Sequence, residues 1–318
     1  MHPQIISILE KQKYDNFSFE NFDLEPGEFL IEYTSSESLS IKKPPYFTSI
    51  QEQRLRIVFR LIRYYFEYNR PSGNYKFILN LTDCATHSKP IPCLCFAKNK
   101  TSNLLLIPNI DFFTHDILRC LNAVREDAGY QEKIVGSIFA GTATGPLENN
   151  TRIRYCLDIL QKKDPSHLGR ITYFDRPEDE WRRIYGDLNP IISKTVPITD
   201  QLAYKILTNI DGHTVCYSRL FWQMASNSIP VYINKSNHEF QFFDYFDYSY
   251  SYYNSSLETY WADYAYILNP KNQSEVNDKI SKGKLYSEVL FGEYLRTPDI
   301  FLYKVLKYIL DRISPLPR

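Results

Sequence analysis

The stretch YKILTNIDG at residues 204–212 decides the fold class that this sequence predicts. Its apolar residues predict a buried strand at 205–209, and Asp211-Gly212 predicts a turn directly after it. A helical pattern follows from about 214 to 225, and an apolar run at 229–233 predicts a second strand. A strand, a helix and a strand in this order are typical of a right-handed crossover between parallel strands, so we expect an α/β fold.

The same alternation continues in both directions along the chain. Short apolar runs predict further strands at 29–33, 75–81, 92–97, 103–107, 134–139, 170–174 and 264–268. Helical spacing predicts helices at 3–12, 49–68, 114–126, 151–161, 177–185, 273–282, 285–295 and 298–312. Ser49 and Glu52 have the spacing of a capping box at the start of the second helix. We therefore predict two Rossmann-like, doubly wound domains with parallel sheets, 1–130 and 131–297, whose functional residues directly follow strands.

Composition argues against several classes of protein. Lys plus Arg and Asp plus Glu both number 37 among the 318 residues, so the formal net charge is zero and a broadly basic, nucleic-acid-binding surface is not expected. No window approaches about 18 apolar residues, and the first residues do not resemble a signal peptide. We therefore expect a cytoplasmic protein without a membrane span. Only 11 glycines are present and no GxxxxGK[ST] pattern occurs, which argues against a P-loop.

A carboxylate follows the strand predicted at 75–81. Asp83 stands where a side chain can face a ligand cleft, and an aspartate there can act as a general base that accepts a proton from an attacking hydroxyl. The alternative is that Asp83 caps the turn after the strand. The Cys and His residues show no metal-ligand or catalytic-triad spacing, so we expect no bound metal.

Two strand-to-helix joints contain the residue types that bind phosphate groups. The first is FAGTATG at 139–145, ahead of a helix predicted from 151, where small residues leave backbone N–H groups and the helix N-terminus open to an anion. An arginine in the first turn of that helix would add charge-assisted hydrogen bonds. The alternative is an ordinary joint without a ligand. The candidates are Gly141, Thr142, Thr144 and Arg152, with Arg154 as a second cation.

The second joint follows the strand at 205–209. The helix predicted from 214 has an N-terminus that favours an anion, and a serine and an arginine lie near its first turn. The candidates at this joint are Asn209, Gly212, Ser218 and Arg219. Glu239 follows the strand at 229–233 and suits hydrogen bonds to ribose or sugar hydroxyls.

Aromatic residues are unusually frequent, with 26 Tyr and 20 Phe, and they concentrate between residues 240 and 266. Tyr faces stack on sugar rings and nucleobases, but they also fill cores. The sequence leaves both roles open for this segment.

Taken together, these stretches resemble glycosyltransferase family 90, which includes Rumi-type, capsule-associated and lipopolysaccharide-modifying transferases. The similarity covers about residues 75–270. Its motifs stand in the family's order: NLTD at 80–83, FAGT at 139–142, YKILTNIDG at 204–212, YSRL at 217–220, SNSIPV at 226–231 and Glu239-Phe240.

The resemblance implies two facing Rossmann-like domains of GT-B type, with the helix at 298–318 packed back on the acceptor-side domain 1–130 and a nucleotide sugar bound by 131–297. It implies an inverting transfer of glucose, xylose or galactose from a UDP-sugar to a hydroxyl of a surface glycan, with Asp83 as the base. Arg219, Thr142 and two helix N-termini would stabilise the leaving diphosphate without a metal or other cofactor. Candidate acceptor contacts are His87, Tyr248 and Tyr250. A peripheral contact with the inner membrane face fits this function.

Three positions depart from the family pattern. Ala140 replaces the arginine of the phosphate loop, Thr82 replaces the arginine before the base, and Asp263-Tyr264 stands where the family has His-Tyr. Two other functions therefore stay open: a catalytically silent carbohydrate-binding protein on the same scaffold, and a transferase of an exostosin-like or fucosyltransferase-like family. The sequence does not choose the donor sugar, the acceptor or the oligomeric state.

Overall fold

The computed structural model describes residues 1–12, 14, 23–34, 36, 38–85, 87–110, 117–213, 218–233, 239–242, 249–294, 298–313 and 315. The chain divides into two compact units, which are described separately below. Unit 1 comprises Met1–His115, Asn237–Phe246 and Val289–Arg318, and unit 2 comprises Asp116–Ser236 and Asp247–Glu288. The boundary expected near residue 130 thus falls inside unit 2 in this division, and the chain changes unit at more than one point.

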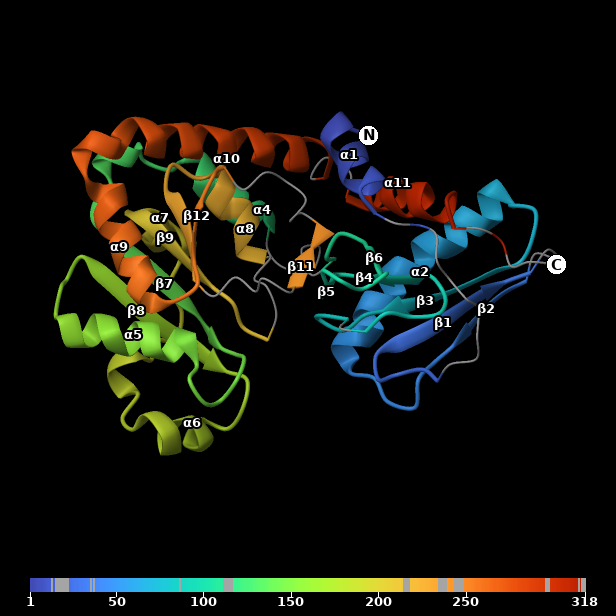
Figure 1. The fold of residues 1–318 in the computed structure, drawn as a ribbon, viewed down its shortest axis with the longest axis horizontal. Helices are drawn as coiled ribbons and strands as arrows, with labels where there is room; N and C mark the ends of the chain where they lie inside the picture. The colour runs from blue at the N-terminus through green and yellow to red at the C-terminus, as the bar shows by residue number, and fades with distance from the viewer. Residues whose placement is uncertain are drawn as a thin grey trace. The chain divides into compact units, whose positions relative to one another are not determined.

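Unit 1 contains a mixed five-stranded sheet, whereas the sequence predicted a parallel one (Figure 1). Its strand order is β2-β1-β3-β4-β6, and β1 runs antiparallel to both of its neighbours. The antiparallel pairing of β1 with β2 follows from their short connection, in which Thr34 N–H donates to Ser38 O, because a tight turn can join only antiparallel strands. The strands are β1 (Glu28–Tyr33), β2 (Leu39–Lys42), β3 (Tyr75–Asn80), β4 (Cys93–Cys95) and β6 (Leu105–Leu106).

The long helix of unit 1 is α2 (Ser49–Asn69), close to its predicted range. Its capping box is formed by Thr48 and Gln51, one position earlier than the predicted pair Ser49 and Glu52. The buried apolar residues recur at helical spacing, which explains why the sequence pattern predicted this helix. They are Leu55, Val58, Leu61, Ile62, Tyr65 and Phe66.

The C-terminal helix α11 (Pro298–Leu310) packs against α2 within unit 1, and α1 (Pro3–Glu10) packs against α11. Arg60 Nη2 lies 2.9 Å from Asp299 Oδ2, and Tyr65 donates a hydrogen bond of 2.9 Å to Asp311. A small antiparallel pair is formed by β5 (Ala97–Asn99) and β11 (Glu239–Gln241).

Unit 2 contains a five-stranded sheet that is entirely parallel, as the sequence predicted for both domains. Its strand order is β12-β10-β9-β7-β8, which is one of the two common orders of doubly wound sheets. The strands are β7 (Ile134–Ala143), β8 (His167–Phe174), β9 (Tyr204–Ile210), β10 (Ile229–Ile233) and β12 (Tyr252–Asn254).

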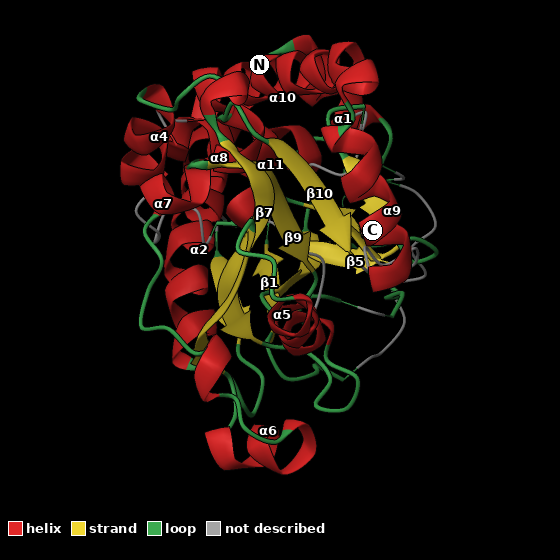
Figure 2. Cartoon of the chain, turned by 90° about the vertical axis from the view of Figure 1, so that its left-hand side faces the viewer, coloured by secondary structure: helices red, strands yellow, loops and turns green. Residues whose placement is uncertain are grey.

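Helices cover both faces of this sheet (Figure 2). One face packs on α5 (Thr151–Lys162) and α9 (Leu257–Leu268), and the core there includes Tyr155 and Tyr260. The other face packs on α4 (Ile117–Arg125), α7 (Ile198–Leu202) and α8 (Ser218–Ala225) around Trp222. Each face therefore buries its own apolar layer, which makes unit 2 a three-layer α/β structure. The remaining helices of the unit include α6 (Glu178–Tyr185) and most of α10 (Gln273–Tyr294).

Three sequence predictions in unit 2 differ from the structure. The strand predicted at 264–268 lies inside α9, which Ser256 caps at its N-terminus. The helices predicted at 273–282 and 285–295 form the single helix α10. The strand predicted at 134–139 continues to Ala143, so the candidate residues Gly141 and Thr142 lie within β7 rather than in the loop after it.

A buried histidine, His167, begins strand β8 of the unit 2 sheet. His167 Nδ1 lies 2.7 Å from Ser137 Oγ, and Ser137 in turn contacts the Tyr155 hydroxyl at 3.0 Å. The ring packs edge-on against Trp261, so water has little access to it. Burial lowers the pKa of His167, and Asp164 opposes that effect from 3.6 Å without reversing it.

The free energy of unfolding is expected to fall when the pH drops below about 6.5, the ordinary pKa of histidine. Above that pH the ring is neutral in both states. Below it the unfolded chain binds a proton that the folded chain binds only at lower pH, so the loss continues down to the folded pKa. The free energy of unfolding falls by at most about 1.4 kcal/mol per pH unit. Urea unfolding of the wild type and of His167→Gln between pH 5 and 8 measures this loss. Equal pH dependence of the unfolding free energy in both proteins would show that His167 is not its cause.

Candidate functional site

The carboxyl ends of β7 and β9 form the switch point of the unit 2 sheet. From β7 the chain crosses to β8 on one side, and it then returns past β7 to β9 on the other side. The helices that follow the two strands, α5 and α8, pack on opposite faces of the sheet. Figure 2 shows β7 and β9 side by side with α5 next to their ends. Ligands of doubly wound folds bind at such a point, and both predicted phosphate joints lie there.

A buried arginine joins the two loops at this point. Arg152 Nη1 donates to Thr142 O at 2.7 Å and to Thr144 Oγ1 at 2.6 Å, both at the end of β7. The Nε and Nη2 groups of Arg152 donate to Ile210 O, at the end of β9, at 3.1 and 2.8 Å. Arg152, which the sequence analysis proposed as a phosphate ligand, therefore connects the two loops by hydrogen bonds to their carbonyl oxygens. The other cation considered, Arg154, is exposed on α5.

The N-terminus of α5 is fixed by Asn150. Its side-chain oxygen accepts a hydrogen bond from Ile153 N–H, and its amide nitrogen donates to Thr144 O at 2.9 Å and to Pro146 O at 3.1 Å. Asn150 thereby caps the helix and closes the loop in front of it. The loop and the helix N-terminus are held in one geometry, which is the condition for backbone N–H groups to bind an anion.

Arg219 approaches the same strand from α8. Its guanidinium lies 4.8 Å from the centre of the Phe139 ring, in the range of a cation–π contact. A Cβ atom at position 141 would lie 2.1 Å from Arg219 Nη2, so only glycine leaves room for the guanidinium there. The structure thus brings together Gly141 and Arg219, which the sequence had proposed from separate motifs.

Gly212 has a similar role at the end of β9. A Cβ atom there would lie 2.2 Å from Thr144 Oγ1 and 2.9 Å from Arg152 Nη2, so the absent side chain allows the two loops to touch. Asn209 is buried instead, and its amide donates to Gln223 at 3.2 Å inside unit 2. Ser218 is the first residue of α8, and Glu239 is the first residue of β11 in unit 1.

Sequence reasoning missed an acid–base pair at this edge of the sheet. Asp175 directly follows β8, and His213 follows the loop after β9. His213 Nε2 lies 2.6 Å from Asp175 Oδ2, with side-chain exposures of 49% and 16%. Asp175 N–H also donates to Ala143 O, which keeps the pair close to the end of β7. The separation of 38 positions between the two residues left no local signal in the sequence.

Asp83 lies in unit 1, three residues after the end of β3, where the sequence placed it. Its side chain is 51% exposed, and Oδ1 accepts a hydrogen bond of 2.9 Å from the buried Arg54. Arg54 also donates to Leu81 O at 2.8 Å, so it fixes the backbone before Asp83 as well as the carboxylate itself. Arg54, which belongs to α2, thus contacts the Asp83 carboxylate. In the family pattern the arginine stands directly before the aspartate, at the position that Thr82 occupies here.

A polar network supports the turn that carries Asp83. Asn80 Oδ1 accepts from Thr82 N–H at 3.0 Å, and the Asn80 amide donates to the buried Glu28 at 3.1 Å. Lys89 lies 2.9 Å from Glu28 and 2.8 Å from Glu25. These contacts hold the turn in one conformation and leave half of the Asp83 side chain open to solvent.

The acceptor candidates are distributed over both units. His87 is exposed in unit 1, four positions after Asp83. Tyr250 belongs to unit 2, is 1% exposed and packs edge-to-face against Tyr286 at 5.8 Å, so packing accounts for its position. Tyr248 lies outside the described residues.

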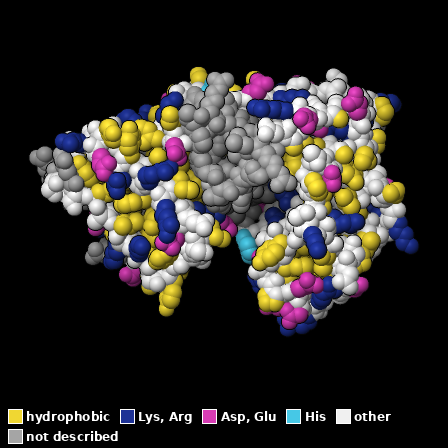
Figure 3. All heavy atoms as spheres, turned by 180° about the vertical axis from the view of Figure 1, so that it is seen from behind, with side chains coloured by type: hydrophobic (Ala, Val, Ile, Leu, Met, Phe, Trp, Pro, Cys, Tyr) yellow, Lys and Arg dark blue, Asp and Glu magenta, His cyan; other side chains and the backbone are white. Residues whose placement is uncertain are grey.

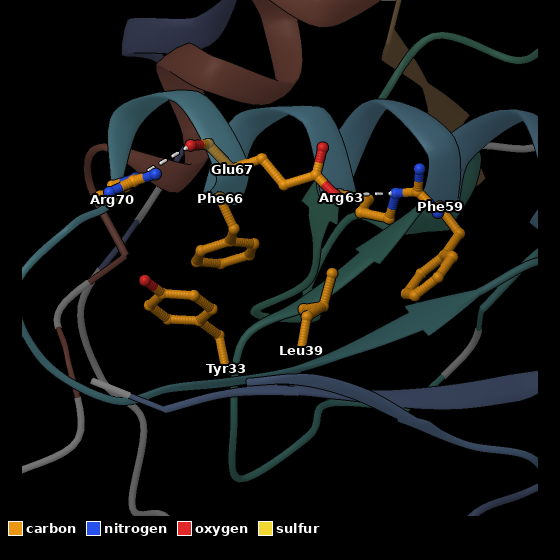
Figure 4. Close-up of a pocket in the computed structure, with 7 residues that line it drawn as sticks. All are labelled: Tyr33, Leu39, Phe59, Arg63, Phe66, Glu67 and Arg70. Carbon is orange, nitrogen blue, oxygen red and sulfur yellow. Dashed lines mark hydrogen bonds and ion pairs between the residues drawn. The ribbon is translucent and has the colours of Figure 1, made fainter. Parts of the chain in front are cut away.

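Unit 1 also contains a cavity of about 450 Å³ between α2 and the strands β1 and β2. Figure 4 shows the rings of Phe66 and Tyr33 and the side chain of Leu39 directed into it, with Arg63, Glu67 and Arg70 on its helix side. Arg54, which binds Asp83, is not among the residues that line the cavity, and the first lining residue on α2, Phe59, follows it by five positions.

Charged side chains of both signs are interspersed on the face drawn in Figure 3, in keeping with the zero net charge. Within the described residues, no group of three or more His, Cys, Asp or Glu side chains is arranged to hold a metal ion. None of the described helices has the length and apolar character needed to cross a bilayer. Neither a scan against models of known protein families nor a search of curated proteins finds a match for this chain.

Proposed function

We propose that the chain is an inverting glycosyltransferase that moves a sugar from a UDP-sugar to a hydroxyl of a carbohydrate acceptor. The observation that carries the proposal is where the candidate phosphate contacts lie in unit 2. The residues singled out from sequence as phosphate contacts, Gly141, Thr144 and Gly212, lie together at the switch point of a parallel sheet. This is the place where doubly wound folds bind nucleotides, which supports the proposal.

The proposed diphosphate site consists of Arg219, the N-terminus of α5 and the backbone of the loops fixed by Arg152. A diphosphate leaving group gains negative charge in the transition state, and a cation with aligned N–H groups stabilises that charge. In this proposal Arg152 positions the loops, and Arg219 is the cation that contacts the phosphate. No metal ion is part of the proposed mechanism.

Asp83 is the proposed general base of the reaction. Its half-exposed carboxylate can accept the proton of the acceptor hydroxyl as that oxygen attacks the anomeric carbon. Arg54 holds one carboxylate oxygen and thereby orients the other. The facing arrangement of the two units as GT-B domains, the cytoplasmic location, a peripheral membrane contact and a surface glycan as acceptor belong to this proposal.

Arg219→Ala is expected to weaken UDP binding by about 10- to 100-fold, because a hydrogen bond from a charged group to phosphate contributes roughly 1.5–3 kcal/mol. Isothermal titration calorimetry with UDP measures the effect. The matched control is Lys271→Ala, which removes one exposed cation of unit 2 beyond the far end of α9. Equal UDP affinity of the wild type and Arg219→Ala would refute the phosphate role of Arg219.

A carbohydrate-binding protein without catalysis is the second candidate. The engagement of the Asp83 carboxylate by Arg54 favours it, because one oxygen of the proposed base is already bound within the fold. Release of UDP from UDP-glucose, UDP-xylose and UDP-galactose, with and without acceptor glycans, distinguishes the two. Binding of glycans without UDP release would favour the second candidate.

A further inference from the structure

The pair formed by His213 and Asp175 has no role in the mechanism above. The two residues follow β9 and β8, the strands on either side of β7, and they meet at the carboxyl edge where the proposed diphosphate lies. Nearly half of the His213 side chain is exposed, whereas Asp175 is mostly buried. The imidazole therefore has one nitrogen bound to a buried carboxylate and one side open to solvent.

The two residues before His213 are fixed by contacts with the end of β7 and with Arg152. Arg152 donates to Asp211 O at 3.2 Å, and Gly212 lies against Thr144 at the end of β7. Asp175 is tied to the same strand through Ala143 O. The orientation of the imidazole is therefore set by the loops that form the proposed phosphate site.

The hydrogen-bonding groups of the pair define what a ligand can meet at the exposed side of the ring. The Nε2 atom donates its hydrogen to Asp175 Oδ2, because a carboxylate can only accept. The other carboxylate oxygen of Asp175 is buried and receives no hydrogen bond from the described residues. An imidazole placed between two anionic acceptors donates to both of them when each ring nitrogen carries a hydrogen.

We propose that His213, oriented by Asp175, donates a hydrogen bond from Nδ1 to a phosphoryl oxygen of the bound nucleoside diphosphate. This inference rests on the proposed function and adds a ligand contact to it. It places a second side-chain donor beside Arg219 in the proposed diphosphate site, since Arg152 is occupied with carbonyl oxygens and Arg154 is exposed on α5. Asp175 is a positioning residue in this proposal, and His213 is the residue that touches the ligand.

The test compares uridine, UMP and UDP as ligands of the whole chain by calorimetry. His213→Ala is expected to lower UDP affinity by about 10- to 100-fold, as for other charge-assisted hydrogen bonds to phosphate, and to leave uridine affinity unchanged. Asp175→Asn is expected to have a smaller effect of the same selectivity, because asparagine still accepts from Nε2 but is an uncharged, weaker acceptor that orients the ring less firmly. Lys271→Ala is the control that removes an exposed cation elsewhere in unit 2, and melting temperatures establish that each variant is folded.

The outcomes separate the inference from the proposed function. If the wild type binds UDP and His213→Ala binds it equally well, the inference is wrong and the proposed function stands. If His213→Ala loses uridine and UDP affinity in equal measure, His213 shapes the pocket and the phosphate contact is refuted. If the wild type binds none of the three ligands, the proposed function fails and the inference fails with it.

Discussion

Asp83→Asn is expected to reduce sugar transfer by about 10²- to 10⁴-fold, the range that a general base contributes. Asparagine has nearly the same shape and can still accept a hydrogen bond from Arg54, so the turn at the end of β3 should persist. It cannot take a proton from an attacking hydroxyl, because its amide is not basic. UDP affinity should stay unchanged, since the proposed diphosphate contacts belong to unit 2 and Asp83 belongs to unit 1. Steady-state transfer assays and calorimetry measure the two quantities.

The chain offers a closely matched control for this variant. Asp299 lies in the same unit and is paired with Arg60 of the same helix α2 at 2.9 Å, the distance that separates Arg54 from Asp83. Asp299→Asn therefore removes the same charge from an ion pair of the same length, whose arginine is exposed rather than buried. Full transfer activity in Asp83→Asn, or equal losses in both variants, would rule out Asp83 as the base.

Asp127→Ala is expected to lower the free energy of unfolding by about 3–5 kcal/mol, because it leaves a buried ammonium without its counter-ion. Lys133 and Asp127 form an ion pair in unit 2 with side-chain exposures of 0% and 2%. Lys133 also donates to Leu202 O, and Asn227 N–H donates to Asp127 at 2.6 Å. Burial lowers the pKa of Lys133, and the bond to Asp127 acts in the opposite direction. Urea unfolding at neutral pH measures the loss.

Two further variants test whether the unpaired charge of Lys133 causes the loss of unfolding free energy in Asp127→Ala. Asp278→Ala breaks an exposed ion pair with Lys282 and should cost at most about 1 kcal/mol. Asp127→Asn combined with Lys133→Met removes both charges and should restore most of the stability lost in Asp127→Ala. A loss below 1 kcal/mol in Asp127→Ala would show that the pair adds little to stability.

Local patterns predicted most of the fold of unit 2. The strand at 229–233 and the helix at 151–161 were found nearly to the residue, because a fully buried strand is a continuous apolar run and a helix buried on one side has a periodic pattern. The segment 257–268 was misread because Tyr264 and Tyr266 suggested a strand. The residues that pack inward there are Tyr260 and Ile267, at helical spacing. In unit 1 the strand β1 was predicted, but its antiparallel direction was not. The direction depends on pairing with β3, whose paired residues lie more than 40 positions away in the sequence.

The candidate site was predictable only in part. Asp83 and Gly212 were singled out because turns after strands have their own composition, whereas Gly141 was expected in a loop and lies within β7. Arg54 and Asp175 were missed because each meets its partner, Asp83 or His213, across 29 or 38 positions, which no spacing rule covers. Arg152 was noticed, but a sequence cannot tell a guanidinium that contacts a ligand from one that binds backbone carbonyls.

The way Arg152 joins the ends of β7 and β9 has an energetic consequence for any ligand of unit 2. Ordering a free loop during binding costs conformational entropy, and this cost is subtracted from the affinity. Here the loops are ordered beforehand by hydrogen bonds that are buried within the folded chain. The cost is therefore met once, during folding, and the site is preorganised when the ligand arrives. Affinity at such a site depends on the stability of unit 2 as well as on the groups that touch the ligand.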